Sequence, residues 1–293
     1  MSPRADGEAG GESARPAPVP RLWIDTDIAL GASAGDVDDG FALAALFGAA
    51  RSGRAEILGI STVSGNADAA TAERCARALA AAARADVRIL AGFGSAAPEG
   101  AARAIADLPE GSRIVALGPL SNVAAAAAID PGLPARAALS VVGGNLSSPG
   151  FLPPLWPHEF NLARDRASAR RVLAAPWREL LFHPLDVVSR LRCGRQRLEE
   201  VSRMGAVGAA LSRDSRRWLA RTRRIPWRSD FAVWDLPAAL AAAGVLPVVS
   251  SPRTFPSAQR AFAGIPDPAL AVTSFDAGVA WRAFLELVRA LAD

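Results

Sequence analysis

Short apolar segments alternate with Ala-rich segments of helical length from residue 21 onward, and this alternation constrains the fold more than any other feature. The apolar segments that fit strands are residues 22–25, 56–63, 87–91, 113–117, 138–142 and 179–183. Helical stretches lie between them at residues 39–51, 68–84, 121–128 and 165–174. Strands that alternate with helices form parallel sheets, because each helix carries the chain back to the start of the next strand. We therefore expect an α/β fold with a mostly parallel central sheet flanked by helices.

The chain beyond residue 186 has a looser pattern. Arg-rich helical sequence covers residues 195–223, and a last strand at 270–275 precedes a terminal helix at 277–292. Because no repeat or linker interrupts residues 21–293, we expect one domain there. Residues 1–20 are rich in Gly, Pro and Ala and are expected to form a disordered tail.

Charge, cysteine content and hydropathy exclude several classes of protein. All 33 residues counted as Lys or Arg are Arg, which excludes Schiff-base catalysis by Lys and a Walker A phosphate loop. A codon bias explains this composition better than nucleic-acid binding, which requires a clustered basic face. Cys75 and Cys193 lack metal-ligand spacing and are expected to be reduced, buried thiols. No apolar run fits a membrane span or a signal peptide, so we expect a cytoplasmic protein without a membrane partner.

Polar residues follow the expected strands at the points where the strands end. They are Asp25 and Asp27 after the first strand, residues 64–66 after the second, Gly118 and Pro119 after the fourth, residues 143–145 after the fifth and Asp186 after the sixth. In parallel α/β sheets ligands bind beyond the carboxyl ends of the strands, where successive loops converge. We therefore expect these residues to line one crevice.

Three carboxylates near the end of the first strand, at residues 27, 38 and 39, indicate a bound cation. Asp27, Asp38 and Asp39 would repel one another and raise one another's pKa if they met without a positive charge among them. No Arg lies between Arg21 and Arg51 to supply that charge. Hard oxygen ligands without Cys or His favour Ca²⁺ or Mg²⁺ over zinc. The alternative is that Asp38 and Asp39 only cap the helix that follows them.

Seven short segments, taken in order, resemble the signature segments of the nucleoside hydrolases, which are calcium-dependent N-ribohydrolases of purine and pyrimidine nucleosides. They are "IDTD", "DVDDGFAL", "STVSGN", "ALGPLSN", "VVGGN", "HEFN" and "FAVWD", and the resemblance runs from about residue 21 to the end. It implies a Rossmann-like α/β fold, hydrolysis of a ribonucleoside to free base and ribose, and a homodimer or homotetramer.

The resemblance also assigns roles to individual residues. Asp27, Asp39, Asp235 and the backbone carbonyl of Leu117 would bind Ca²⁺, and Asp27 would be the general base for the calcium-bound water. Residues that would contact the sugar are Asp38, Asn66, Glu159 and Asn161, with Asn145 as a looser candidate. Trp234 precedes the last calcium ligand, where purine-preferring members have Trp, so it would stack on a purine base.

The two histidines are weaker candidates. His158 is adjacent to Glu159 and could reach the sugar or the base. His183 is expected to be a satisfied buried residue or a strand-end residue.

Two departures from the family pattern bear on the site. The segment "IALGASAG", residues 28–35, replaces a tighter connection between the two groups of aspartates, and residues 92–113 form a shorter segment than usual. A nucleoside-binding or ribose-binding homologue without turnover is therefore one alternative. The other is a Mg²⁺-dependent haloacid dehalogenase-like phosphohydrolase with Asp25 as nucleophile and Asp27 as acid/base. That family expects a downstream Lys or Arg and a later acidic pair, whereas this chain has no Lys and places Asp38 and Asp39 too early.

Overall fold

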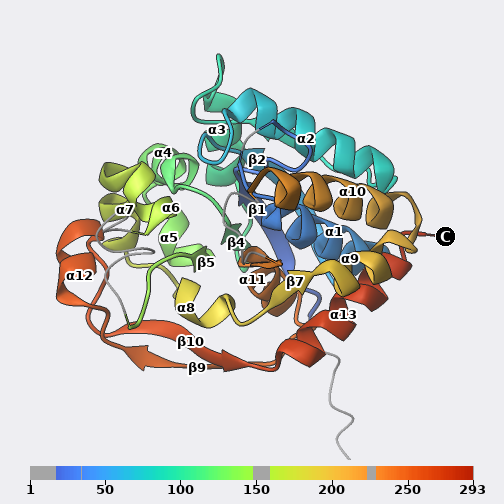
Figure 1. Ribbon diagram of the computed structural model, residues 1–293. Helices are drawn as coiled ribbons and strands as arrows, with labels where there is room; N and C mark the ends of the chain where they lie inside the picture. The colour runs from blue at the N-terminus through green and yellow to red at the C-terminus, as the bar shows by residue number, and fades with distance from the viewer. Residues whose placement is uncertain (1–17, 34, 148–158, 223–228, 293) are drawn as a thin grey trace, which may run out of the picture.

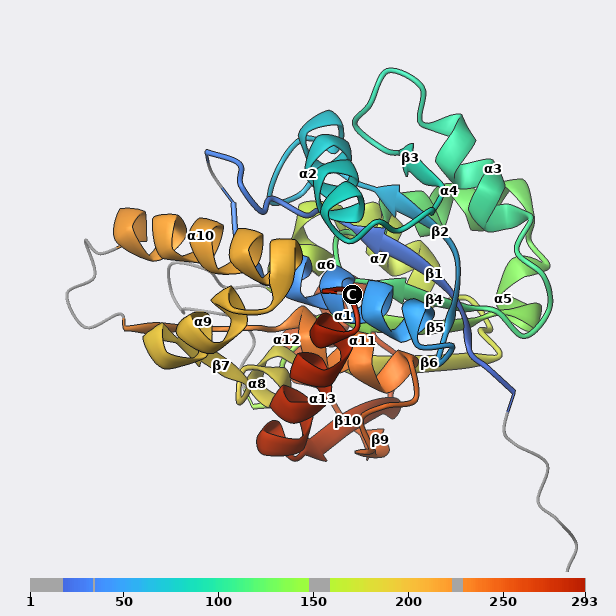
Figure 2. The same ribbon diagram turned by 90° about the vertical axis from the view of Figure 1, so that its right-hand side faces the viewer.

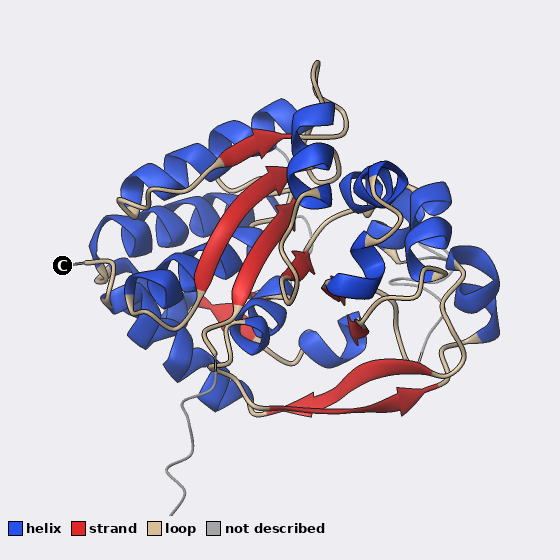
Figure 3. Cartoon of the chain, turned by 180° about the vertical axis from the view of Figure 1, so that it is seen from behind, coloured by secondary structure: helices blue, strands red, loops and turns tan. Residues whose placement is uncertain are grey.

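The central feature of the fold is a mostly parallel sheet. The computed structural model describes residues 18–33, 35–147, 159–222 and 229–292. In that part of the chain, an eight-stranded sheet has the order β3-β2-β1-β4-β5-β6-β10-β9. All neighbouring strands are parallel except β9, which pairs antiparallel with β10 at one edge (Figure 3). Its strands are β1 (Arg21–Thr26), β2 (Glu56–Thr62), β3 (Ile89–Ala91), β4 (Arg113–Ala116), β5 (Ala138–Val142), β6 (Glu179–His183), β9 (Val248–Arg253) and β10 (Ala269–Phe275).

Helices cover both faces of this sheet (Figure 1). The helices on one face are α1 (Asp38–Arg51), α2 (Ala69–Ala82), α8 (Leu185–Val188), α9 (Arg195–Ser202), α10 (Gly205–Thr222), α11 (Asp235–Ala242) and α13 (Ala277–Arg289). Those on the other face are α3 (Glu99–Ala106), α4 (Ser121–Ile129), α5 (Leu133–Arg136), α6 (Phe160–Arg164), α7 (Arg166–Leu173) and α12 (Ser257–Ala263). A small antiparallel pair, β7 (Arg192–Gly194) and β8 (Asp230–Ala232), lies outside the main sheet.

Two apolar cores lie on opposite faces of the sheet. Along β1, Leu22 and Ile24 belong to one core and Trp23 to the other, because successive side chains of a strand point to opposite faces. Phe41 of α1 packs in the first core with ring centroids 5.9 Å from Phe231 and 5.4 Å from Phe284. The central strands β4 and β5 are almost entirely buried on both faces, which is why their sequences are mostly apolar.

The expected α/β class and all seven expected strands are confirmed, with small differences at the ends of elements. The helical stretch 195–223 is divided into α9 and α10, which pack side by side (Figure 2). The break lies at Gly205, whose φ of +63° is a left-handed conformation that glycine adopts without strain. The expected pattern did not include α3 or the edge strand β9.

Three further expectations concern the N-terminal tail, membrane-spanning helices and the two cysteines. Residues 1–17 of the expected tail lie outside the described residues. No helix in the described ranges is long and apolar enough to cross a membrane. Cys193 is buried as expected, whereas Cys75 is only partly buried, and both are free thiols.

Candidate active site

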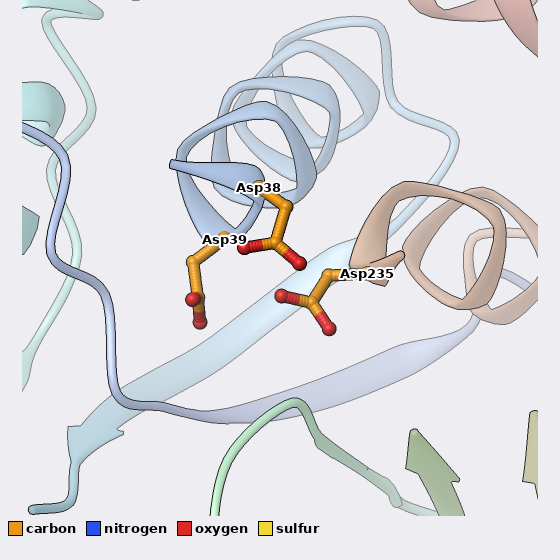
Figure 4. A group of neighbouring side chains, drawn as sticks. All are labelled: Asp38, Asp39 and Asp235. Atoms are coloured by element: carbon orange, nitrogen blue, oxygen red, sulfur yellow. The ribbon is translucent and has the colours of Figure 1, made fainter. Parts of the chain in front are cut away.

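Three aspartates from two helices form a compact group at the carboxyl end of the sheet. Asp38 and Asp39 are the first residues of α1, and Asp235 is the first residue of α11, which packs directly against α1. Their side chains meet in the same space (Figure 4), and one oxygen of each lies within 4.8 Å of the others. All three are buried, with exposed fractions of 5% or less. The packing of α1 on α11 therefore brings together residues almost 200 positions apart.

The charge of this group is poorly compensated by the protein. Thr26 Oγ1 donates a short hydrogen bond to Asp39 Oδ1. Asp39 Oδ2 and Asp38 Oδ1 are buried and accept no hydrogen bond from the described residues. Burial raises the pKa of Asp38, Asp39 and Asp235 well above the usual range, and the neighbouring carboxylates raise it further. Buried, unpaired carboxylate oxygens that face one another are suitable ligands for a hard divalent cation such as Ca²⁺.

Asp27 lies next to this group in a tightly shaped recess. Its Oδ2 accepts a hydrogen bond of 2.6 Å from the backbone N–H of Asn66, while its buried Oδ1 has no partner among the described residues. A Cβ atom at Gly65 would overlap Asp27 Oδ2, and one at Gly118 would lie 3.0 Å from Oδ1. Burial raises the pKa of Asp27 to about 6. The carboxylate thus has one oriented oxygen and one unpartnered oxygen.

The three-carboxylate group differs from the set implied by the family resemblance. That set joined Asp27 to Asp39 and Asp235, whereas the three carboxylates that lie within 4.8 Å of one another are those of Asp38, Asp39 and Asp235. Asp27 remains close enough that its charge is the strongest neighbouring carboxylate effect on the pKa of Asp39. The two assignments therefore concern one continuous cluster of four buried aspartates.

The loop after β4 is linked to α6 by Asn161. Its Nδ2 donates hydrogen bonds of 2.8 Å to the carbonyl oxygen of Leu117 and 3.1 Å to that of Val142. Glu159 caps α6 by accepting hydrogen bonds from the N–H groups of Asn161 at 2.8 Å and Leu162 at 2.9 Å. Burial raises the pKa of Glu159 to about 7. The Leu117 carbonyl still has a second lone pair available to a ligand.

A cavity of about 590 Å³ opens above these residues. This volume falls within the range of roughly 300–1,000 Å³ that is common for small-molecule sites. Seven of the site residues predicted from the sequence line this cavity: Asp38, Asn66, Leu117, Glu159, Asn161, Trp234 and Asp235. Asp27 and Asp39 are fully buried and are not part of the lining.

Asn145 is the expected sugar contact that does not line the cavity. Its backbone N–H donates a hydrogen bond of 2.9 Å to Gln259 Oε1, and its carbonyl accepts one of 2.9 Å from Gln259 Nε2. This reciprocal pair attaches the loop after β5 to α12. The contact uses only the backbone of Asn145, and its side-chain Nδ2 is buried without a hydrogen-bond partner among the described residues.

The inserted segment lies between β1 and α1, and the structure describes its residues 28–33 and Gly35. Ile28 is buried, and its N–H donates a hydrogen bond of 3.2 Å to Thr26 Oγ1. Gly31 and Gly35 have φ angles of +83° and +94°, conformations that glycine adopts readily. Arg221 of α10 donates a hydrogen bond of 3.0 Å to the carbonyl of Ala32. The insertion is thus accommodated by a turn in which the Ala32 N–H donates a hydrogen bond of 2.9 Å to the Ala29 carbonyl, and by contact with α10.

Asp25 has a structural environment unlike that of the other aspartates. Its Oδ1 accepts hydrogen bonds of 2.6 Å from Ser61 Oγ and 2.8 Å from Asn122 Nδ2. It is fully buried, its pKa is raised by burial to about 7, and it does not line the cavity. These contacts favour the supporting role expected for Asp25 over that of a phosphohydrolase nucleophile.

Sequence analysis missed several residues of the cavity wall. They are Phe160, Ala163, Arg164, Leu185, Val142 and Trp218, and Asp36 was given no role. Val142 and Phe160 lie within the quoted segments "VVGGN" and "HEFN" but were given no role. No motif marked Ala163, Arg164, Leu185 or Trp218, which reach the wall through the packing of α6, α8 and α10.

His183 does not line the cavity. His183 is buried at the end of β6 as expected, but neither ring nitrogen has a hydrogen-bond partner among the described residues. Burial lowers its pKa to about 3. The expected strand-end position of His183 is therefore confirmed, whereas no described residue supplies a hydrogen-bond partner for its ring. His158 lies outside the described residues.

Comparison with protein families gives one match that covers most of the chain. The family model described as inosine-uridine preferring nucleoside hydrolase matches residues 22–266. No curated protein matches the chain.

Solved structures of low sequence identity share the fold. A plant nucleoside hydrolase has a TM-score of 0.73 at 18% identity, with 93% of this chain and 99% of that chain covered. A purine-preferring ribonucleoside hydrolase from Gardnerella vaginalis has a TM-score of 0.69 at 16% identity, with 93% and 99% covered. An inosine-uridine preferring nucleoside hydrolase from Bacillus anthracis has a TM-score of 0.69 at 14% identity, with 92% and 99% covered.

Proposed function

The chain belongs to the inosine-uridine preferring nucleoside hydrolase family, and from this premise we propose that it is a calcium-dependent enzyme that releases purine bases from ribonucleosides. Membership supports hydrolysis of the N-glycosidic bond. The observation that carries the finer proposal is a cavity with buried carboxylates at its inner end and tryptophans in its wall. The carboxylates suit a cation and a sugar, and the aromatic rings suit a planar base.

The buried carboxylates fit Ca²⁺ by their chemistry. Asp38 Oδ1 and Asp39 Oδ2 have no hydrogen-bond donor among the described residues, and Asp235 lies with them. We assign Asp39, Asp235 and the Leu117 carbonyl as ligands, with Asp27 and Asp38 as the candidates for the remaining carboxylate. Bound there, Ca²⁺ would hold the ribose hydroxyls and increase the acidity of a water molecule.

Asp27 is the proposed general base. The Asn66 N–H orients one carboxylate oxygen, and the other oxygen is free of hydrogen bonds from the described residues. A carboxylate held in this way can accept the proton of an attacking water if that water lies within hydrogen-bond distance. Burial raises the pKa of Asp27 to about 6 in the absence of a metal, and a bound cation would lower it, so this carboxylate is ionised at neutral pH.

Polar residues of the cavity are proposed to bind the sugar. Asn66, Asn161 and Glu159 line it beside Asp38. Cleavage of a glycosidic bond passes through a state with positive charge on the sugar ring. Buried carboxylates around the ring stabilise that charge because little solvent screens them.

Trp234 supports a preference for purines. It is half-buried, lines the cavity and immediately precedes Asp235 at the start of α11. A ring in this position lies close to both the proposed metal ligand and the space for the base. Stacking on a bicyclic purine would bury more apolar surface than stacking on a pyrimidine.

The proposal is tested by release of reducing sugar from inosine, guanosine, adenosine, uridine and cytidine in the presence of Ca²⁺. We expect faster hydrolysis of the purine nucleosides and loss of turnover in Asp27→Ala. Binding of Ca²⁺ and ribose without turnover on any of the five would instead identify a nucleoside-binding homologue. Faster hydrolysis of uridine and cytidine would contradict the purine preference alone.

A further inference from the structure

The short helix α6 connects the inner end of the cavity to its rim. Glu159 and Asn161 at its start are buried, with exposed fractions of 2% and 8%. Phe160 is 40% exposed, and Arg164 at the last position of α6 is also exposed. All four residues line the same cavity. A ligand whose sugar contacts Glu159 and Asn161 therefore lies in the same cavity as Phe160 and Arg164.

Arg164 has donors available at this rim. Its guanidinium carbon lies 6.0 Å from the centre of the Phe160 ring, which holds the side chain over an aromatic face. The Arg164 guanidinium donates no hydrogen bond to any described residue and forms no ion pair with one. By contrast, the Asn161 amide already donates to two carbonyl oxygens. The five N–H groups of an Arg side chain can therefore serve a ligand.

The charges of the cavity wall give Arg164 a specific chemical role. The other charged residues of the described lining are Asp36, Asp38, Glu159 and Asp235. Carboxylates accept hydrogen bonds and would repel the acceptor atoms of a nucleobase. Among the described residues that line the cavity, Arg164 is the one with a cationic side chain. It therefore suits a part of the ligand that is rich in hydrogen-bond acceptors.

We propose that Arg164 is a specificity-determining residue that donates hydrogen bonds to acceptor atoms on the leaving base, and that it selects 6-oxopurine nucleosides. This inference rests on the proposed hydrolysis of purine nucleosides. The O6 and N7 atoms of a 6-oxopurine form a pair of adjacent acceptors that an Arg fork can contact together. Adenine presents an amino donor at the same position, which an Arg fork cannot contact in this way.

The same contact assists departure of the base. Water adds its hydroxyl to the anomeric carbon, the C–N bond breaks, and the bonding electron pair moves onto the base, which takes up the remaining proton. Negative charge develops on the base before that proton arrives. A guanidinium beside O6 and N7 stabilises this charge without itself losing a proton, because Arg stays protonated in proteins.

The test compares Arg164→Met with the matched variant Arg166→Met. Arg166 is also exposed, but its guanidinium lies over Phe262 and it does not line the cavity. The substrates are inosine, guanosine, adenosine and p-nitrophenyl β-D-ribofuranoside, whose leaving group is a stable anion without a purine edge. We expect Arg164→Met to lower kcat/KM for inosine and guanosine about 10- to 100-fold. We expect less than about a threefold change for the other two substrates, and for Arg166→Met on all four.

Three outcomes would overturn the inference. An equal loss on all four substrates would show a structural role, and unchanged hydrolysis of inosine would show that Arg164 does not contact the base. A wild-type protein that cleaves none of the four would refute the proposed function and this inference together. Thermal unfolding of Arg164→Met should match that of the wild type, because the side chain is exposed.

Discussion

The side-chain amide of Asn161 donates a hydrogen bond of 2.8 Å to the backbone carbonyl oxygen of Leu117. This contact joins the start of α6 to the loop after β4, and it orients the carbonyl that is proposed to bind Ca²⁺. The same amide also contacts the carbonyl of Val142 at the end of β5. Asn161 therefore fixes the relative positions of two strand ends at the cavity.

Asn161→Ala is expected to weaken calcium binding. Loss of a residue that orients a metal ligand lowers metal affinity by about 10- to 100-fold in other sites. The dissociation constant is measured by calorimetric titration of Ca²⁺ into chelator-treated protein. Asn145→Ala is the matched control, because Asn145 is also buried but does not line the cavity. Equal weakening by both variants would mean that Asn161 has no special relation to the metal.

Gly65→Ala is expected to abolish most of the activity without unfolding the protein. A Cβ atom there would overlap Asp27 Oδ2 and displace the proposed general base. General-base catalysis contributes about 10²- to 10⁴-fold to rate, so a loss of at least about 100-fold in kcat is expected. Gly100→Ala in α3 is the control, since a Cβ atom there meets nothing within 4 Å. Wild-type kcat in Gly65→Ala would contradict the proposed role of Asp27.

Chelator-treated protein is expected to lose stability as the pH rises. Burial raises the pKa of Asp27 to about 6 and that of Asp25 to about 7, from 3.8 for each. A group whose pKa is higher in the folded state contributes stability below its unfolded pKa and loses that contribution as pH rises through its folded pKa. The melting temperature in chelator should therefore fall between about pH 4 and 7.

Added Ca²⁺ should reverse this loss, and more strongly at higher pH. Metal ions compete with protons for carboxylates, so binding is tighter when the carboxylates are ionised. At a concentration about 100 times the dissociation constant, the expected stabilisation is about 2.7 kcal/mol. An increase in melting temperature that is the same at pH 5 and pH 8 would argue against a carboxylate site.

Glu159→Gln is expected to become more stable than the wild type as the pH rises. Burial raises the pKa of Glu159 to about 7 from 4.5, so ionisation in the folded state is unfavourable. The stability of the wild type relative to Glu159→Gln should fall between these two pH values, by on the order of 3 kcal/mol. Chemical denaturation of both proteins in chelator at pH 4.5, 6 and 8 measures the difference. A difference independent of pH would exclude the raised pKa.

The main sheet could be predicted from the sequence because its strands are buried on both faces. Continuous apolar runs such as residues 138–142 are visible without any knowledge of their neighbours, and the strand agrees with the expectation. The edge strand β9 was not predicted, because it is largely exposed and its sequence contains two serines and a proline. Local pattern identifies strands by their burial, and β9 lacks that signal.

The candidate site could be predicted only in part. Asp38 and Asp39 follow a strand and stand out by charge, but Asp235 joins them through the packing of α1 on α11, which no local pattern encodes. It was found by the family resemblance alone. Arg164 and Trp218 reach the cavity wall through α6 and α10, and neither belongs to a motif that marked it.

We expect hydrolysis to require one Ca²⁺ bound by the buried aspartates. The most direct measurement is the rate of inosine hydrolysis as a function of free Ca²⁺ for the wild type and Asp235→Asn, with Asp130→Asn, an exposed ion-pair variant, as control. We predict a saturable dependence with one site in the wild type and in Asp130→Asn, and at least about a 100-fold lower rate in Asp235→Asn. Full activity in excess chelator, or an unchanged calcium dependence in Asp235→Asn, would contradict it.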